Sequence, residues 1–219
     1  AVAGVVAAGL ALPLARRSVG SPSARAPRGV LTLMGGIVVL LALFPHLVTF
    51  LYRVGYAQLV LPLYASGPAG MDPSFIGLLL GTQAMIAVVM LGPAGWLTNR
   101  LGVRPVLAGA LLLTSIGVAL TPVLPPPLGL WIAVGLFGAG LAIMGVASGL
   151  FVFTLTGYST AMLVSMYRLS GDLMQVLGPM AVGPVLEAIG FEWTFFGLAA
   201  CGLLALLSLG IRRGGAKAA

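Results

Sequence analysis

Six long apolar segments separated by short turns restrict the fold of this chain more than any other feature. They lie at about 31–65, 73–98, 103–122, 128–155, 161–187 and 191–211. A helix of about 20 apolar residues crosses a hydrocarbon core about 30 Å thick, and only helices and closed barrels satisfy their backbone hydrogen bonds in lipid. Because the segments are continuously apolar and do not alternate, a β-barrel is disfavoured. The sequence therefore predicts an all-α, polytopic membrane helix bundle with six transmembrane helices.

The composition agrees with insertion in a bilayer. Of the 219 residues, 60% are hydrophobic and only 7% are charged, whereas soluble domains carry about 25% charged residues. The 32 glycines predict close helix contacts, since packing drives helix association in lipid. A single cysteine, Cys201, excludes a disulfide framework or a cysteine metal site. We expect the lipid bilayer as a partner, no nucleic acid, and neither a metal nor a cofactor.

The ends of the chain predict a wider architecture. Residues 1–15 resemble the end of a preceding transmembrane helix, and residues 16–29, "RRSVGSPSARAPRG", are polar. Residues 30–213 form the six-helix unit and 214–219 a tail. Since the chain begins inside an apolar stretch, we expect it to be part of a longer protein. The first segment is too long for one straight crossing, so we expect a span near 38–65 that Pro45 and Pro62 bend.

Charge predicts the orientation of the bundle, because short cytoplasmic loops are enriched in Lys and Arg. Ten of the eleven basic residues fall in or beside alternate connections, and three of the four acidic residues fall in the others. This distribution predicts that both termini, the linker at 16–29 and the tail at 214–219 are cytoplasmic. The basic residues concerned are Arg16, Arg17, Arg25, Arg28, Arg100, Arg104, Arg168, Arg212, Arg213 and Lys217, and the acidic ones are Asp72, Glu187 and Glu192.

The stretch "GWLTNRLGVR", 95–104, predicts a very tight hairpin between the second and third spans. Gly95 removes a side chain where a neighbouring helix could approach, and Gly102 permits a turn conformation barred to bulkier residues. Arg100 and Arg104 are suited to bind carboxylates or helix C-termini. A simpler interpretation, in which the two arginines only set the topology, explains the charge but not the glycine spacing.

This hairpin resembles the signature loop of the major facilitator superfamily, roughly G-x-x-x-D-R-x-G-R-R. The matching positions depart from it in two places: Asn99 replaces the acidic residue that joins a latch between the family's two halves, and Val103 replaces a basic one. A second match is "RLSGDLMQVLGPMAVGPVLEAIG", whose Gly178, Pro179 and Gly183 resemble the helix-bending G-P-x-x-G element of the fifth helix of a half, with three residues in place of two before the last glycine. A third is "RVGYAQLVLPLYA", which resembles a first helix.

The resemblance implies the C-terminal six-helix half of a twelve-helix transporter, whose partner is an N-terminal half that this chain lacks. In that family the substrate site lies near mid-bilayer between two halves that rock to expose it alternately to each side. We therefore expect secondary active transport of a small-molecule substrate, coupled to protons, in a bacterial inner membrane, and no enzymatic activity.

Ionisable residues inside the spans are the candidate pathway residues, because charges in a bilayer usually face a cavity or a partner. His46, Arg53 and Tyr56 fall on one face of a helix, with Arg53 suited to attract an anionic group and His46 to titrate near neutral pH. The alternatives are a His46 at the helix end or hydrogen-bonded to a carbonyl beside Pro45, and an Arg53 in a purely structural pair.

The other candidates lie on later spans. Arg168 and Asp172 are four residues apart, so they are expected to form an ion pair, with Asp172 as an alternative proton site. Gln83 and Gln175 are uncharged candidates for substrate or interhelical hydrogen bonds.

Three other functions remain as alternatives. The first is a multidrug-type efflux exporter, and the second is a non-transporting membrane scaffold. The third is a rhomboid-like intramembrane protease with Ser148 as nucleophile, which needs a base within hydrogen-bond reach. The only histidine, His46, precedes Ser148 in the chain, whereas the rhomboid arrangement places it on a later helix. Around Ser148, Gly138, Ala142, Gly145 and Gly149 predict a packing face.

Overall fold

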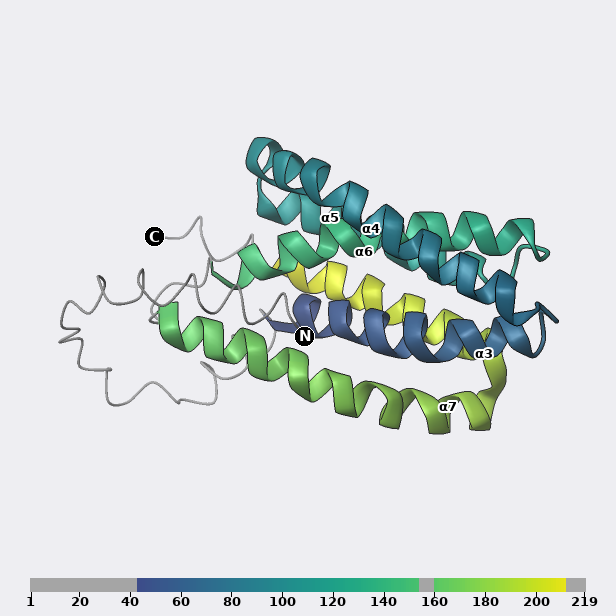
Figure 1. Ribbon diagram of the computed structural model, residues 1–219. Helices are drawn as coiled ribbons and strands as arrows, with labels where there is room; N and C mark the ends of the chain where they lie inside the picture. Colours follow the sequence, from purple (N-terminus) through teal and green to yellow (C-terminus); the bar gives the residue numbers. More distant parts are fainter. Residues whose placement is uncertain (1–42, 154–159, 212–219) are drawn as a thin grey trace, which may run out of the picture. The chain divides into compact units, whose positions relative to one another are not determined.

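The computed structural model describes residues 43–153 and 160–211, which belong to one compact unit, Ile37–Ala219. Every regular element in these two ranges is a helix, as the sequence predicts (Figure 1). The predicted preceding helix at 1–15, the linker at 16–29, the lead-in before residue 43 and the tail at 214–219 lie outside the described residues.

The first helix, Leu43–Ser66, contains a π-helical stretch, η1 (Tyr52–Val60), followed by α3 (Leu61–Ser66). The stretch ends two residues before Pro62, which has no N–H to donate to the preceding turn. Pro45 and Pro62 were expected to bend this span. The structure instead shows a π-helical segment, η1, in this span. Its i→i+5 hydrogen bonds widen each turn and therefore change which side chains lie on the same side of the helix.

Helix α4 (Pro73–Leu101) begins where the sequence predicts, with Asp72 in an extended conformation before Pro73. The Asp72 side chain forms no capping hydrogen bond. A single residue, Gly102, separates α4 from α5 (Val103–Leu120), and its φ of 91° lies in the left-handed region that favours glycine. The very tight hairpin predicted from "GWLTNRLGVR" is therefore present.

Helices α6 (Leu128–Val152) and α7 (Thr160–Ile211) complete the bundle. Gly190, with φ 79° and ψ 178°, interrupts α7, and Figure 1 shows the chain reversing there, so that the yellow C-terminal part runs back along the bundle. In the described ranges five helices are long and apolar enough to span a membrane, and the last covers 49 residues. At 1.5 Å per residue it would extend about 74 Å, more than two bilayer cores. The break at Gly190 makes it two crossings, the predicted fifth and sixth spans.

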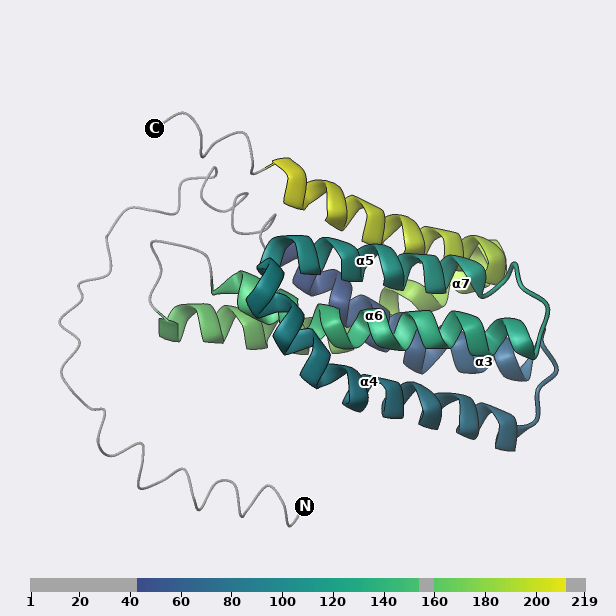
Figure 2. The ribbon, with the colours of Figure 1, turned by 90° about the horizontal axis from the view of Figure 1, so that it is seen from above.

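The core is centred on α5 and α6, whose backbones touch through two glycines. A Cβ atom at Gly117 would lie 2.7 Å from the backbone nitrogen of Phe137, and one at Gly140 would lie 2.8 Å from that of Thr114. Figure 2 shows α5 and α6 running side by side, with the last part of α7 beyond α5. Glycine therefore serves close helix packing here, as the composition predicts.

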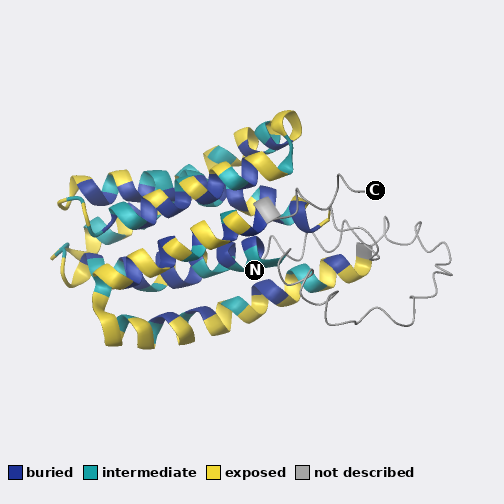
Figure 3. Cartoon of the chain, turned by 180° about the vertical axis from the view of Figure 1, so that it is seen from behind, coloured by how far each residue is buried: buried dark blue, intermediate teal, exposed yellow. Residues whose placement is uncertain are grey.

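The outer helices expose wide apolar surfaces. Only 6% of the most apolar window of α4 is buried, compared with 50% for α6. Figure 3 shows the exposed residues along the outer side of the first part of α7, where Val176 and Met180 are 62% and 66% exposed. Such surfaces on a monomer mark contact with lipid or protein. Together with the apolar helices, they identify a multi-pass membrane protein.

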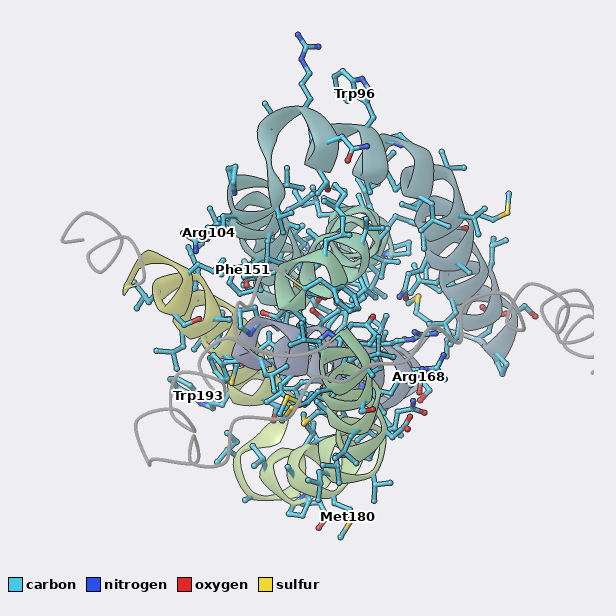
Figure 4. The ribbon with its side chains drawn as sticks, turned by 90° about the vertical axis from the view of Figure 1, so that its left-hand side faces the viewer. Trp96, Arg104, Phe151, Arg168, Met180 and Trp193 are labelled. Carbon is cyan, nitrogen blue, oxygen red and sulfur yellow. The ribbon has the colours of Figure 1, made fainter. Side chains whose placement is uncertain are left out.

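The charges separate between the two ends of the bundle. The α4–α5 turn and the start of α7 lie at one end, whereas the α3–α4 loop and the Gly190 reversal lie at the other (Figure 1). Arg100, Arg104 and Arg168 are therefore near one end, and Asp72, Glu187 and Glu192 near the other. In Figure 4, which looks onto the arginine-rich end, Trp96 and Met180 project from opposite sides of the bundle.

Candidate functional site

An open cavity of about 820 Å³ lies between the first helix, α4 and α6. Its size falls within the range of about 300–1,000 Å³ that is usual for small-molecule sites. The lining side chains are mostly apolar, with three polar ones from the first helix and one from α4. The polar ones are Thr49, Arg53, Gln58 and Gln83.

Arg53 gives this cavity its charge. Its exposed side chain lines the cavity from the middle of the Leu43–Ser66 helix. The chain has four acidic residues, and none of them lines the cavity. Within residues 43–153 and 160–211, no ion pair neutralises Arg53, so the structural pairing weighed from the sequence is not found there. The cavity therefore presents a positive charge to whatever enters it.

Gln58 shares the cavity with Arg53 because both lie within η1. Residues five apart lie on different sides of an α-helix, but the i→i+5 hydrogen bonds of a π-helix bring them toward the same side. Sequence reasoning with the α-helical period therefore missed Gln58. The polar pattern R-x-x-x-x-Q in an apolar span, with Pro62 after it, is the signal that could have found it.

Gln83, one of the candidates from the sequence, reaches the cavity from α4. Its side chain packs against α6 at Gly138, where a Cβ atom would lie 3.4 Å from the Gln83 Cγ. Ala142 and Gly145 also line the cavity, and a Cβ at Gly145 would meet no described residue within 4 Å. The small residues of α6 thus serve two purposes: Gly138 provides packing space, and Gly145 leaves the cavity wall open.

His46 does not line the cavity. It is 1% exposed, and its Nε2 lies 3.2 Å from the carbonyl oxygen of Tyr167, on whose ring it also stacks at 4.1 Å between centroids. Since a carbonyl oxygen only accepts, Nε2 donates this bond, and in a neutral imidazole Nδ1 accepts from the Ser148 hydroxyl at 3.4 Å. His46 is thus bonded to a carbonyl, but to that of Tyr167 on α7 and not to one beside Pro45.

Tyr56 is fully buried in the core. Its hydroxyl donates to the Thr121 hydroxyl at 2.7 Å, which in turn donates to the Gly117 carbonyl. The prediction that His46, Arg53 and Tyr56 form one pathway face is therefore wrong: only Arg53 lines the cavity. The prediction fails for two reasons. Neighbouring helices cover only part of the length of the first helix, and the π-helical turns of η1 change the angle between successive side chains.

The α7 candidates also lie outside the cavity. Arg168, Asp172 and Gln175 are exposed, and none of them lines the cavity. The expected ion pair between Arg168 and Asp172 is absent from the described part of the chain, so that prediction is wrong. An exposed side chain on a helix surface is not held against its neighbour one turn away, because nothing covers the pair and fixes both rotamers.

The G-P-x-x-G element contacts η1 through residues that differ from those predicted. A Cβ at Gly178 would lie 3.9 Å from Val54, and a Cβ at Gly55 would lie 3.0 Å from the Val182 side chain. Gly183 was expected to allow tight packing, but within 43–153 and 160–211 nothing lies within 4 Å of such an atom there. Helix α7 continues through Pro179.

The loop motif is solvent- or lipid-exposed at the end of the bundle. Asn99, Arg100 and Arg104 are exposed, and the Arg100 guanidinium lies 5.2 Å from the Trp96 ring centroid. Gly95 was expected at a helix contact, but in the described ranges a Cβ there would meet nothing within 4 Å. Among the described residues, no three metal-ligating His, Cys, Asp or Glu side chains lie together.

Comparison with known proteins gives one finding. Residues 47–217 match the family model of the Major Facilitator Superfamily. No curated protein matches the chain. The matched range contains all of η1 and the later helices, and therefore every wall of the cavity.

Proposed function

Because the chain belongs to the major facilitator superfamily and is therefore a membrane transporter of that type, we propose that it moves a small organic solute by alternating access through the Arg53 cavity. The observation that carries this proposal is a cation in an open cavity at the middle of a membrane span, with no ion pair to it among the residues that the structure describes. A charge at mid-bilayer costs about 2.5–3.5 kcal/mol on insertion scales, so it is retained where it has a function.

The described helices constitute one half of the transporter in this proposal. A second six-helix bundle covers the open side of the cavity and part of the exposed apolar surface of α4 and α7. Two features support this arrangement: the cavity is open, and α4 is almost unburied although it is the second wall of the cavity.

The proposed location is a bacterial inner membrane, with the arginine-rich end in the cytoplasm. Cysteine labelling tests the orientation. The native cysteine is first removed by Cys201→Ser, and a single cysteine is then introduced at Asn99 or at Ser66, which lie at opposite ends of the bundle. In right-side-out vesicles, a membrane-impermeant maleimide should label Ser66→Cys and spare Asn99→Cys. The reverse pattern would invert the proposed topology.

Proton coupling through Asp172 is a further part of the proposal. Its support is position: Asp172 is an exposed carboxyl group in the first part of α7, within a membrane-spanning segment, where ionisable side chains are costly and usually functional. Asp172→Asn should abolish uptake or efflux driven by an imposed pH gradient while leaving exchange of solute across the membrane intact. Unchanged gradient-driven transport would remove Asp172 from the mechanism.

The central experiment compares Arg53 variants in proteoliposomes. A panel of radiolabelled sugars, amino acids, organic anions and lipophilic cations is screened with the unmodified protein, in both directions, which separates import from multidrug-type export. For a transported compound, Arg53→Gln should lower the initial rate at least about tenfold, and Arg53→Lys should lower it less. Equal rates in all three proteins would favour a scaffold that uses the fold for helix contacts alone.

A further inference from the structure

We propose that the cavity selects organic anions, each with one carboxylate or similar head group and an apolar body, over neutral or cationic solutes of the same shape. The inference names the substrate class of the cavity and rests on the proposed transport function. It stands on three features of the cavity wall: its charge, its amide groups and its apolar remainder.

Charge selects the sign of the solute. Arg53 is the only charged side chain among the residues that line the cavity in the described ranges. Two unit charges about 4 Å apart interact far more strongly in a protein interior than in water. An anion therefore gains an attractive partner, a cation is repelled, and a neutral solute leaves the guanidinium unpaired. The positive charge of Arg53 also disfavours the lipophilic cations that a multidrug exporter would carry.

The neighbouring amides extend the anion site beyond a single ion pair. The guanidinium offers a planar fork that matches the two oxygens of a carboxylate. Gln58 enters from η1 and Gln83 from α4, so two N–H₂ groups are available for the remaining lone pairs. The Thr49 hydroxyl already donates to the Pro45 carbonyl at 2.9 Å, so this residue contributes only an acceptor.

The rest of the wall suits the apolar part of the solute. Leu80, Val88 and Leu91 of α4 face the cavity together with Leu141 and Val146 of α6. These side chains offer no hydrogen bond, so a sugar or another polyhydroxylated solute would leave its hydroxyls unsatisfied against them. An aromatic or branched aliphatic carboxylate buries its body there and keeps its head group at Arg53.

Binding measurements with ligands of similar shape but different charge test whether the cavity selects its ligand by charge. The purified protein in lipid nanodiscs is titrated calorimetrically with benzoate, with the neutral isostere benzamide and with the cation benzyltrimethylammonium. Benzoate should bind at least about tenfold more tightly than benzamide, and the cation should not bind. Arg53→Gln should remove the preference for benzoate, and Arg53→Lys should keep part of it. Gln58→Ala should weaken benzoate binding about threefold to tenfold, whereas Gln175→Ala, on α7 outside the cavity, should leave it unchanged.

Several outcomes would overturn the inference. They are equal affinities for benzoate and benzamide, a preference for the cation, no benzoate binding up to millimolar concentration, or unchanged benzoate binding in an Arg53→Gln variant that melts at the wild-type temperature. Benzoate flux in proteoliposomes is measured separately. Charge-selective binding without flux would contradict the transport function and leave the binding specificity standing, whereas flux of cations or sugars without benzoate binding would contradict the specificity alone.

Discussion

The imidazole Nδ1 of His46 lies 3.4 Å from the hydroxyl of Ser148, although 102 residues separate them in the chain. Both side chains are 1% exposed, and the same imidazole donates to the Tyr167 carbonyl. The contact therefore ties three helices together in the interior. A serine–histidine pair is thus formed, contrary to what chain order suggested, but its burial keeps a peptide substrate away from the serine.

Replacing His46 with alanine should destabilise the bundle and not impair a catalytic step. The change leaves the buried Tyr167 carbonyl without its donor and removes the ring stacking, with a cost of about 1–3 kcal/mol. The apparent melting temperature in detergent should fall accordingly, and Ser148→Ala should cost less. A fluorophosphonate probe should leave Ser148 unlabelled. Covalent labelling that disappears in both His46→Ala and Ser148→Ala would instead revive the protease alternative.

Two glycines on α6 should respond to alanine with opposite signs. At Gly140 an added Cβ would overlap the Thr114 hydroxyl and press on its backbone nitrogen, whereas at Gly135 it would meet nothing within 4 Å. Overpacking costs about 1–3 kcal/mol, but alanine improves helix propensity by about 1 kcal/mol over glycine. Gly140→Ala should therefore lower the melting temperature and Gly135→Ala should hold or raise it. Equal effects would show that α5 and α6 are not in backbone contact.

The contact between η1 and α7 predicts a compensating pair of substitutions. A Cβ at Gly55 would lie 3.0 Å from Val182 Cγ2, so Gly55→Ala should destabilise the protein, and Val182→Ala should do so by leaving a gap. In the double variant the new methyl group fits the space, and the two changes should cost less together than their sum. A double-mutant cycle of melting temperatures measures this coupling, expected at about 0.5–1 kcal/mol. Strict additivity would contradict the contact.

The one-residue turn between α4 and α5 should depend on glycine at position 102. Its φ of 91° is strained for any residue with a Cβ, at about 1–3 kcal/mol. Gly102→Ala should lower the melting temperature, whereas Gly95→Ala, in the helical part of the same motif, should not, because the added atom has open space. If both variants melt alike, the left-handed turn is not required.

Much of the fold follows from local features of the sequence. The apolar runs, the prolines after Asp72 and Thr121, and the glycines at 102 and 190 place the helix ends within a few residues of those observed. The separation of Arg100, Arg104 and Arg168 from Asp72, Glu187 and Glu192 along the bundle follows as well. Hydropathy, turn chemistry and loop charge act through neighbouring residues and the bilayer, so they can be read without knowing which helices touch.

The candidate site followed only in part. Arg53 and Gln83 are polar residues in apolar spans, and that alone singled them out. Gln58 was missed and Tyr56 was placed with Arg53 because an α-helical period was applied to a π-helical stretch. His46 precedes that stretch and was misplaced because Ser148 of α6 and Tyr167 of α7 pack against it. Arg168 and Asp172 were paired on spacing alone, although no surrounding structure holds them together.

The sequence by itself determined that this chain crosses a membrane as a helix bundle, where its turns fall, and which polar residues are costly enough in lipid to need a function. Only the tertiary structure decided which of those residues share a cavity, which are sealed in the core, and which glycines bring backbones into contact. The physical reason is that burial of one face of a helix depends on what packs against it, and those neighbours come from distant parts of the chain.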